Sequence, residues 1–463
     1  MVFRGWFNMH CRHLIFPFLV MAVSSMASER QITNDPNTNC VLDYNHNFSP
    51  DGQWLVFDTR PFDRDILYST SVEKVHVVTG ERVVLYRAPD PVPDLGPGVA
   101  AVSYFPLRDE VIFIHGPFTR TRLKYEKTRR TGAIVPGDGS GGVTWADARD
   151  VTPPFTPGAL RGGTHRHDPG GPDGRWIGFT YDDQVMAEYG RKVGRDLHLR
   201  TLGVTHLGAP VTVDEDSAGE NRSGAGFSVV VVRVTPKDEL DANPGTDAIY
   251  RAQDDQWVGR RGYRKPDGTW QLARGFIGVM RVPDGRGEMR DHDEVFVVDI
   301  PDDITRRGPN GPLEGTETTF PSPPAGTTQR RLTHTERGCF GLVRSASDGS
   351  ALSFLSRDEN GKPQVFTISP LGSQMRQVTS FPAGVQEAAR WLPDDRHFVT
   401  VVDHQVVVVE IGTGHSRPLT DSERGRPFGL VLSPDGRLVA FNRTVESGGA
   451  KTNEIFVADI VLP

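Results

Sequence analysis

The chain lacks the features that would place it in a membrane, in a helical bundle or among enzymes with a familiar nucleophile. After the apolar run Leu14–Val23, no apolar stretch approaches the roughly 20 residues that span a bilayer. Helical periodicity nowhere exceeds about three turns. The motifs G-x-S-x-G, Walker A and H-E-x-x-H are absent. Instead, 50 glycines and 35 prolines indicate many turns and a core of short strands.

A predominance of one charge is also missing. The sequence contains 52 Lys and Arg residues and 59 Asp and Glu residues, and the two signs are interspersed. A mildly acidic chain without a basic stripe does not suit a phosphate backbone, which excludes nucleic acid as a partner.

The first 27 residues have the pattern of an export signal. Arg4 and Arg12 supply positive charge, Leu14–Val23 is apolar but short, and Ser25-Met26-Ala27 offers the small residues that a signal peptidase reads. We predict cleavage after Ala27 and a mature chain, residues 28–463, in the periplasm or secreted, with no membrane span. An uncleaved anchor is the alternative.

A short tag of the form R-x-[ILV]-T recurs along the chain. Its later copies, the last of them looser, are Arg149–Thr152, Arg330–Thr333, Arg376–Thr379 and Arg417–Thr420. Each of these closes one repeat, whereas Arg30–Thr33 opens the mature chain with no repeat before it. The last repeat, ending at Pro463, has no tag. We therefore predict that Arg30–Thr33 completes the last repeat and closes the ring of a β-propeller.

A second marker is a tight turn built on Pro-Asp-Gly or a close variant, followed by an alternating strand. Proline presets the first turn position, and Asp and Gly tolerate the later ones. The copies are Ser49–Gly52, Gly171–Gly174, Ala346–Gly349, Leu392–Asp395 and Ser433–Gly436. In the last three repeats the turns and the tags recur at the same intervals, and two independent markers with one period indicate blades.

These markers predict an all-β fold, a single seven-bladed propeller, with six or eight blades as alternative counts. Blade 4, residues 225–333, is oversized. We expect its first two strands at Phe227–Val234 and Gly275–Val282, with a polar insertion at 238–271. A proline-rich extended connector is expected at 302–326.

Two cysteines remain after cleavage, because Cys11 lies in the signal peptide. Cys40 and Cys339 each start the innermost strand of a blade, and these blades are not neighbours. A disulfide needs Cα atoms within roughly 7 Å, so we expect two free, partly buried thiols.

The best candidate site is the entry to blade 3, Thr164-His165-Arg166-His167-Asp168. Side chains two apart on a strand point the same way, so His165 and His167 are candidates to share a metal, or for one to bind it while the other acts as a base. A packed or surface histidine pair is the other interpretation. Asp43, Tyr44 and His46 enter blade 1 similarly.

Arginines gather in the loops between blades: Arg161, Arg337, Arg424 and Arg426. These loops share a face with the loops joining second and third strands, where the central channel opens. Guanidinium forks match carboxylates and phosphates, so their convergence would favour an anionic ligand such as an acidic sugar. Alternatively, Arg337 and Arg424 pair with the neighbouring Glu336 and Glu423.

Several segments resemble known families. Ser49–Asp58 is similar to the repeat of TolB-type propellers, and Thr152–His165 and Gly315–Thr319 resemble the YidR-like family of bacterial proteins. The likeness covers nearly the whole mature chain and implies a TolB-like propeller without an established activity. A more distant similarity is to oligogalacturonate lyases, propellers with a manganese site of histidines and a glutamine. It is carried by His165 and His167, but Gly162 stands in place of the glutamine.

Two functions follow as hypotheses. The favoured one is a non-catalytic, monomeric propeller that binds an anionic glycan or an envelope component, such as a protein, through its channel face. Its candidate ligand-binding residues are Arg161, His46, Asp43, Arg337 and Arg424. The alternative is a metal-dependent lyase resembling the oligogalacturonate lyases. There His165 and His167 would hold manganese beside a uronate carboxylate, which Arg161 would bind.

Overall fold

The computed structural model describes residues 1–2, 29–43, 45–61, 66–216, 219–447 and 449–463. Nearly all of the predicted signal peptide, with its cleavage site, lies outside the described residues, as do Cys11 and Tyr44. The helices are short: α1 (Gln184–Val193), α2 (Lys237–Ala242), and the single turns η1 (Ile66–Tyr68), η2 (Thr119–Thr121) and η3 (Lys127–Arg129). No helix among these residues has the length and apolar character needed to cross a bilayer.

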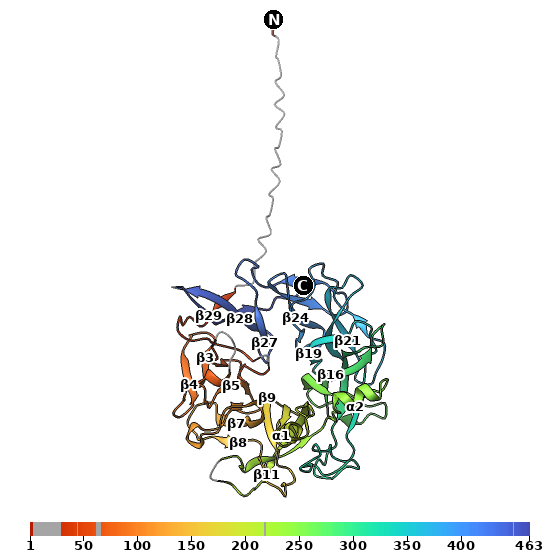
Figure 1. Cartoon of the computed structure of the whole chain (residues 1–463). Coiled ribbons are helices and arrows are strands. Elements are labelled where there is room, and N and C mark those ends of the chain that lie inside the picture. The colour runs from red at the N-terminus through yellow and green to blue at the C-terminus, as the bar shows by residue number, and fades with distance from the viewer. Residues whose placement is uncertain (3–28, 44, 62–65, 217–218, 448) are drawn as a thin grey trace.

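Seven antiparallel sheets follow one another round a ring, with β9, β19 and β27 near its axis (Figure 1). The predicted all-β, seven-bladed propeller is therefore confirmed. Within a blade, strands run in chain order from the innermost outward. This order places the Pro-Asp-Gly turns on one face. The loops between second and third strands, and those between blades, lie on the other, here called the channel face.

The first three blades contain eleven strands. Blade 1 has β2 (Trp54–Asp58), β3 (Ser71–His76) and β4 (Arg82–Arg87); blade 2 has β5 (Val99–Tyr104), β6 (Glu110–His115), β7 (Thr131–Pro136) and β8 (Thr144–Trp145); blade 3 has β9 (Gly162–Gly170), β10 (Trp176–Asp183), β11 (Arg200–Val211) and β12 (Gly224–Val230). Bridges from Val41 to Asp58 and from Phe48 to Leu55 place Val41 and Phe48 beside β2, at the inner edge of blade 1.

The remaining blades each have four strands. Blade 4 has β13 (Arg251–Trp257), β16 (Ala273–Pro283), β17 (Met289–Asp299) and β18 (Thr328–Arg331), with the hairpin β14 (Tyr263–Arg264) and β15 (Trp270–Gln271) between its first two strands; blade 5 has β19 (Cys339–Ser345), β20 (Leu352–Arg357), β21 (Pro363–Ile368) and β22 (Arg376–Gln377); blade 6 has β23 (Arg390–Trp391), β24 (His397–Val402), β25 (Gln405–Glu410) and β26 (Ser416–Pro418); blade 7 has β27 (Phe428–Leu432), β28 (Leu438–Ser447), β29 (Ala450–Asp459) and β1 (Arg30–Gln31).

The ring closes as the tag pattern predicts. β1 pairs with Val457 and Phe456 of β29, and Ile32 N donates to Ile455 O at 2.8 Å. The N-terminal strand therefore supplies the outer strand of the last blade, and this edge of the sheet is covered. Apolar side chains of blades 1 and 7 then pack together in one cluster.

The tag threonine fastens the outer part of a blade. Thr33 Oγ1 accepts a hydrogen bond from Ile455 N at 2.8 Å and donates one to Glu454 Oε2 at 2.6 Å. Thr333 and Thr379 make the same two bonds, to a backbone N–H and to the Glu or Gln before it, on the third strands of their own blades. A hydroxyl that serves as both donor and acceptor explains why the tag ends in threonine.

Of the two strands predicted to begin blade 4, the second is correct, because Gly275–Val282 lies within β16, and the first is wrong. Residues from Phe227 onward were expected to begin blade 4, but β12 is the outermost strand of blade 3. The innermost strand of blade 4 is β13, which lies inside the predicted insertion because its Gln and Asp residues hide the apolar alternation. The tag Arg149–Thr152 forms no strand either, since β8 precedes it and completes blade 2.

Cys40 and Cys339 are both free, as predicted. They are more deeply buried than expected, with exposures of 0% and 1%. Burial raises the pKa of each thiol to about 12, so both stay protonated and unreactive at neutral pH.

Candidate functional site

A cluster of cationic side chains surrounds one carboxylate on the channel face. Asp182 is the next-to-last residue of β10, and the cations whose charges act on it or on one another come from four places in the chain. They are Lys127 of η3, Arg130 just before β7, Arg200 at the start of β11 and Arg251 at the start of β13. The strand ends of blades 2, 3 and 4 meet at this edge, which brings together side chains that are far apart in sequence. We call these four cations and Asp182 the Asp182 cluster.

Asp182 already has three partners. Its Oδ2 lies 3.2 Å from His165 Nε2 and 3.4 Å from Arg200 Nη2, and its Oδ1 lies 3.3 Å from His198 Nε2. Burial would raise the pKa of Asp182, but the hydrogen bonds from His165 and His198 and the charge of Arg200 hold it well below its ordinary value. The carboxylate is therefore ionised at neutral pH and is committed to these groups.

Two cations of the cluster have no such partner. Among the residues that the structure describes, neither Lys127 nor Arg251 makes an ion pair or a side-chain hydrogen bond, and Arg251 Nε is buried. Burial and the nearby charge of Arg200 lower the pKa of Lys127. Burial likewise lowers the pKa of Arg200, with Arg251 and Arg130 adding to the effect. Because these neighbouring cations repel one another, a bound anion would stabilise their charged forms.

A cavity of about 340 Å³ adjoins the Asp182 cluster. It lies between η3 and α1, and Lys127, His198, Gln184 and Arg191 contribute polar atoms to its wall. Glu126 also lines it, and its carboxylate is paired with Arg129 at 3.3 Å. His198 is 45% exposed, and its hydrogen bond with Asp182 raises its pKa. The cavity thus offers an anion a polar, largely cationic wall that opens to solvent.

The two predicted metal ligands do not face a common point. Arg166, between them, has a φ of 54°, and the ladder from β9 to β10 shifts register there. This bulge breaks the strand alternation. His165 contacts Thr180 and Asp182 within blade 3, whereas His167 Nε2 bonds Thr164 Oγ1 at 3.0 Å and lies against Gly132 of blade 2.

Both histidine rings are buried and neutral. Burial lowers the pKa of His165 and of His167 to about 3. Among the described residues, no group of three or more His, Cys, Asp or Glu side chains is arranged to hold a metal ion. The side chains around His165 and His167 therefore do not fit the expected manganese site, and we derive no reaction step through a metal.

Arg161 is placed inside the protein. Its side chain is 0% exposed, its Nη2 lies 2.9 Å from Asp183 Oδ2, and it donates to Thr316 O and Thr319 O. It thereby ties the connector 302–326 to blade 3. With these partners Arg161 is not presented to the channel, and it takes no part in the function proposed below.

The other predicted ligand-binding residues lie apart from the Asp182 cluster. His46 is 3.5 Å from Asp168, which also binds Arg274, toward the channel end that carries the Pro-Asp-Gly turns. Asp43 is buried against Arg60 at 3.3 Å. Arg337 and Arg424 are exposed, and Arg337 donates to Asp358 O rather than to Glu336. The structure therefore brings His46 near Asp168 but does not gather the four interblade arginines around one point.

The members of the Asp182 cluster were missed in the sequence. Their common signal is position, because all but Lys127 stand where a strand meets a loop of the channel face. Asp182 lies at the end of β10, Arg130 directly precedes β7, and Lys127 lies in η3 just before Arg130. A search of loop ends, in place of a search for histidine pairs, would have found them.

Comparisons with known proteins agree with the propeller fold. A protein family of unknown function, DUF3748, matches residues 98–220. An oligogalacturonate lyase in complex with manganese aligns with a TM-score of 0.52 and 15% identity, over 95% of this chain and 94% of that one. The oligogalacturonate lyase from Vibrio parahaemolyticus aligns with a TM-score of 0.52 and 13% identity, over 95% of both chains. At such identities these structures show a shared fold alone.

The similarity to the protein YidR of Escherichia coli (strain K12), described as uncharacterised, identifies the family of this chain. It is 36% identical over 425 residues, which make up 89% of this chain and 94% of YidR. Identity at this level over nearly the whole of both sequences shows common descent. The chain belongs to the family of YidR.

Proposed function

We propose that this protein is an exported binding propeller that holds an acidic oligosaccharide at the Asp182 cluster, without catalysing a reaction on it. One observation carries the proposal: the charges of Lys127 and Arg251 act on the Asp182–Arg200 pair, yet neither side chain makes an ion pair within the described part of the chain. An acidic sugar supplies carboxylates at intervals along a polar chain. It could therefore pair with both cations while its hydroxyls meet the cavity wall.

The physics of the site favours an anion over a neutral ligand. Charge-assisted hydrogen bonds from a guanidinium or an ammonium to a carboxylate are about twice as strong as neutral ones. Arg251 presents a planar fork, which matches a carboxylate, while Lys127 presents a mobile point charge. The ligand's negative charge would also offset the repulsion among Lys127, Arg200 and Arg130.

Calorimetric titration with trigalacturonate at low ionic strength tests the proposal. We expect saturable binding that weakens as salt is added, because the exposed charges are then screened. Lys127→Ala and Arg251→Ala should each weaken it about tenfold or more, the value of one charged hydrogen bond. Arg437→Ala should leave it unchanged, since that side chain is 86% exposed and belongs to a turn of the opposite face.

Three results would reject this site. They are equal binding of a neutral trisaccharide, wild-type affinity in both cluster variants, and no saturable binding of trigalacturonate. A propeller that binds an envelope protein instead would give the third result.

The second candidate function is a metal-dependent lyase, which rests on the presence of His165 and His167. From the ligand geometry we expect no stoichiometric transition metal in purified protein, and no unsaturated product from uronate oligomers with added manganese. Elemental analysis and ultraviolet absorbance measure these two outcomes. A metal present in the wild type and in His415→Ala, but lost in His165→Ala, would contradict the expectation, because His415 is exposed on blade 6.

A further inference from the structure

A second cavity, of about 410 Å³, lies on the other side of α1 from the Asp182 cluster. One stripe of the helix, Gln184, Ala187 and Arg191, faces the cavity beside Lys127. Another stripe, Met186 and Tyr189, faces this second cavity. The two sets follow helical spacing, so one short helix separates two distinct cavities.

The walls of the second cavity come from three parts of the chain. The end of blade 3 and the segment after β12 form one side, and the connector 302–326 crosses over to form the other. Arg161 fixes the connector there through Thr316 O and Thr319 O. The cavity is therefore a built feature of the fold, and the long connector that the sequence shows has a structural purpose in enclosing it.

Apolar and polar groups share its wall. Val230, Val232 and Val234 contribute apolar surface, and Tyr181 and Phe320 add aromatic surface. Two of the polar groups are already bonded: Tyr181 Oη donates to Asp183 at 3.0 Å, and Thr201 Oγ1 donates to Val232 O at 2.6 Å. A concave site that combines aliphatic and aromatic side chains with polar groups suits an amphipathic organic ligand.

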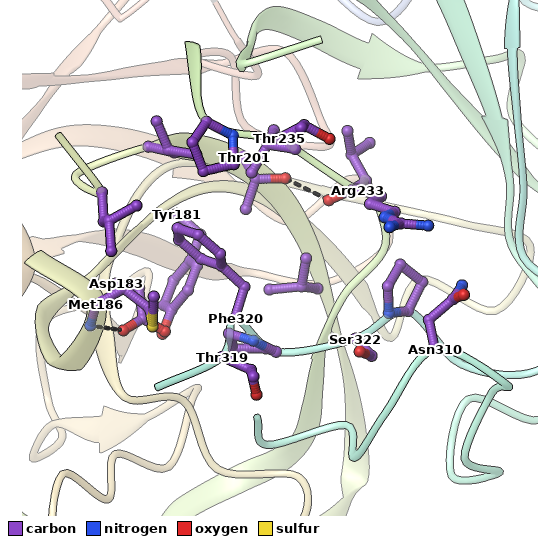
Figure 2. A pocket seen from close by; sticks show the side chains of 18 of the residues that line it. Tyr181, Asp183, Met186, Thr201, Arg233, Thr235, Asn310, Thr319, Phe320 and Ser322 are labelled. Carbon is purple, nitrogen blue, oxygen red and sulfur yellow. Dashed lines mark hydrogen bonds between the residues drawn. The ribbon is translucent and has the colours of Figure 1, made fainter. Parts of the chain in front are cut away.

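The cation Arg233 lies at one end of the cavity. Figure 2 shows Arg233, Asn310 and Ser322 on one side of the cavity, with Asp183 and Met186 on the opposite side. Among the described residues, Arg233 makes no ion pair and its guanidinium no hydrogen bond, and the residue is exposed. The wall holds two carboxylates, and both are paired: Asp183, at the far end, with Arg161, and Glu239 with Arg195.

We propose that this cavity binds a small amphipathic acid, with its apolar body between Tyr181 and Phe320 and its carboxylate on Arg233. The apolar lining stabilises the body by removing it from water. The cation at the open end accepts the head group, and the opposite placement of Asp183 sets the orientation. Nothing in the acidic-oligosaccharide proposal requires this site.

Titration with decanoate, and with the uncharged decanol of equal chain length, tests the inference. We expect decanoate to bind at one site per chain and decanol about tenfold more weakly, the difference that one charged contact makes. Arg233→Ala should weaken decanoate binding about tenfold and leave decanol unchanged. Phe320→Ala should weaken both ligands, because it removes apolar wall from the cavity.

The controls separate the two sites. Lys127→Ala should bind decanoate as the wild type does, and Arg233→Ala should keep its affinity for trigalacturonate. Thermal melting of each variant establishes that it is folded, which we expect because Arg233 is exposed and Phe320 is only partly buried. Equal affinity for decanoate and decanol, wild-type decanoate binding by Arg233→Ala, or no saturable binding would overturn the inference.

Discussion

Burial lowers the pKa of three histidines in this protein, His115, His165 and His167. His115 is 0% exposed, its Nε2 lies 2.9 Å from Tyr86 Oη, and the rings of Phe118 and Trp145 pack against it. Burial lowers its pKa to about 4 from an ordinary 6.5. The folded state therefore holds the neutral ring, and the unfolded chain takes up a proton as the pH falls below 6.5.

Replacing His115 should change how stability depends on pH. Because its pKa is lower in the folded state, its protonation favours the unfolded chain, and stability is lost as pH falls from 6.5 toward 4. In His115→Gln the loss of unfolding free energy between pH 7 and 5 should be smaller by about 2 kcal/mol. Urea unfolding at both pH values measures it. The exposed His415→Gln should behave as wild type, and an unchanged pH dependence in His115→Gln would contradict the assignment.

The sequence predicted the positions and contacts of individual residues less completely than it predicted the fold. The buried, free state of Cys40 and Cys339 followed from their positions. His165 and His167 do not point in the same direction, contrary to expectation. The expectation assumes a regular strand, and the β-bulge at Arg166 interrupts the strand between them. The convergence of Lys127 and Arg251 depends on strand ends of different blades meeting in space, which no local pattern encodes.

At the scale of elements, bulges recur in the innermost strands. Five blades have a residue of positive φ where the inner ladder shifts register: Ala101, Arg166, Asp254, Gly341 and Gly429. Glycine adopts this conformation without strain, and other residues adopt it at a cost. In blades 3 and 4 the positions hold charged residues, and Arg166 lies 3.5 Å from Asp254. In these two blades the strained backbone conformation thus occurs at residues whose charged side chains contact the neighbouring blade.

Adding a methyl group at a glycine bulge should destabilise the propeller through the backbone. Gly429 has a φ of 70°, and a Cβ there would meet its nearest atom, Asn442 Oδ1, at 3.4 Å, an ordinary contact. Gly429→Ala should therefore lower the unfolding free energy by about 1–2 kcal/mol, the cost of the left-handed conformation. Gly412→Ala, in open space without positive φ, should change it by less than about 0.5 kcal/mol. Equal unfolding midpoints in urea for the two variants would contradict this explanation.

Elements were predictable where turns and alternation agree. The strands after the Pro-Asp-Gly turns stand where the sequence places them, because turn chemistry and apolar alternation act together. β13 was missed because Gln253, Asp254 and Asp255 interrupt its apolar pattern. Buried Asp255 accepts a hydrogen bond from Arg274 at 2.8 Å, so a polar residue of this innermost strand is satisfied by a partner that the sequence pattern does not reveal.

At the scale of the whole molecule, the ring depends on a few bonds between its ends. Glu454 is 1% exposed, and its carboxylate accepts hydrogen bonds from Thr33 Oγ1 and Asp35 N. Arg443 is also buried, and its Nε lies 2.8 Å from Glu29 Oε1. Residues before position 34 therefore satisfy buried charges of the last blade, as well as covering the edge of β29. The tag Arg30–Thr33 predicted this closure because it has no repeat of its own to close.

A chain that begins at residue 34 should be less stable against unfolding than one that begins at Ser28. It loses the pairing of β1 with β29 and the Glu29 partner of Arg443, and breaking a buried ion pair costs about 3–5 kcal/mol. We expect its urea unfolding midpoint to fall and its exposed β29 edge to promote aggregation, read by light scattering. Removing the exposed residues 461–463 is the matched control, and its midpoint should not change. Equal midpoints for the chains beginning at 28 and at 34 would mean that blade 7 holds together without the N-terminal strand, and that ring closure contributes little to the stability of the propeller.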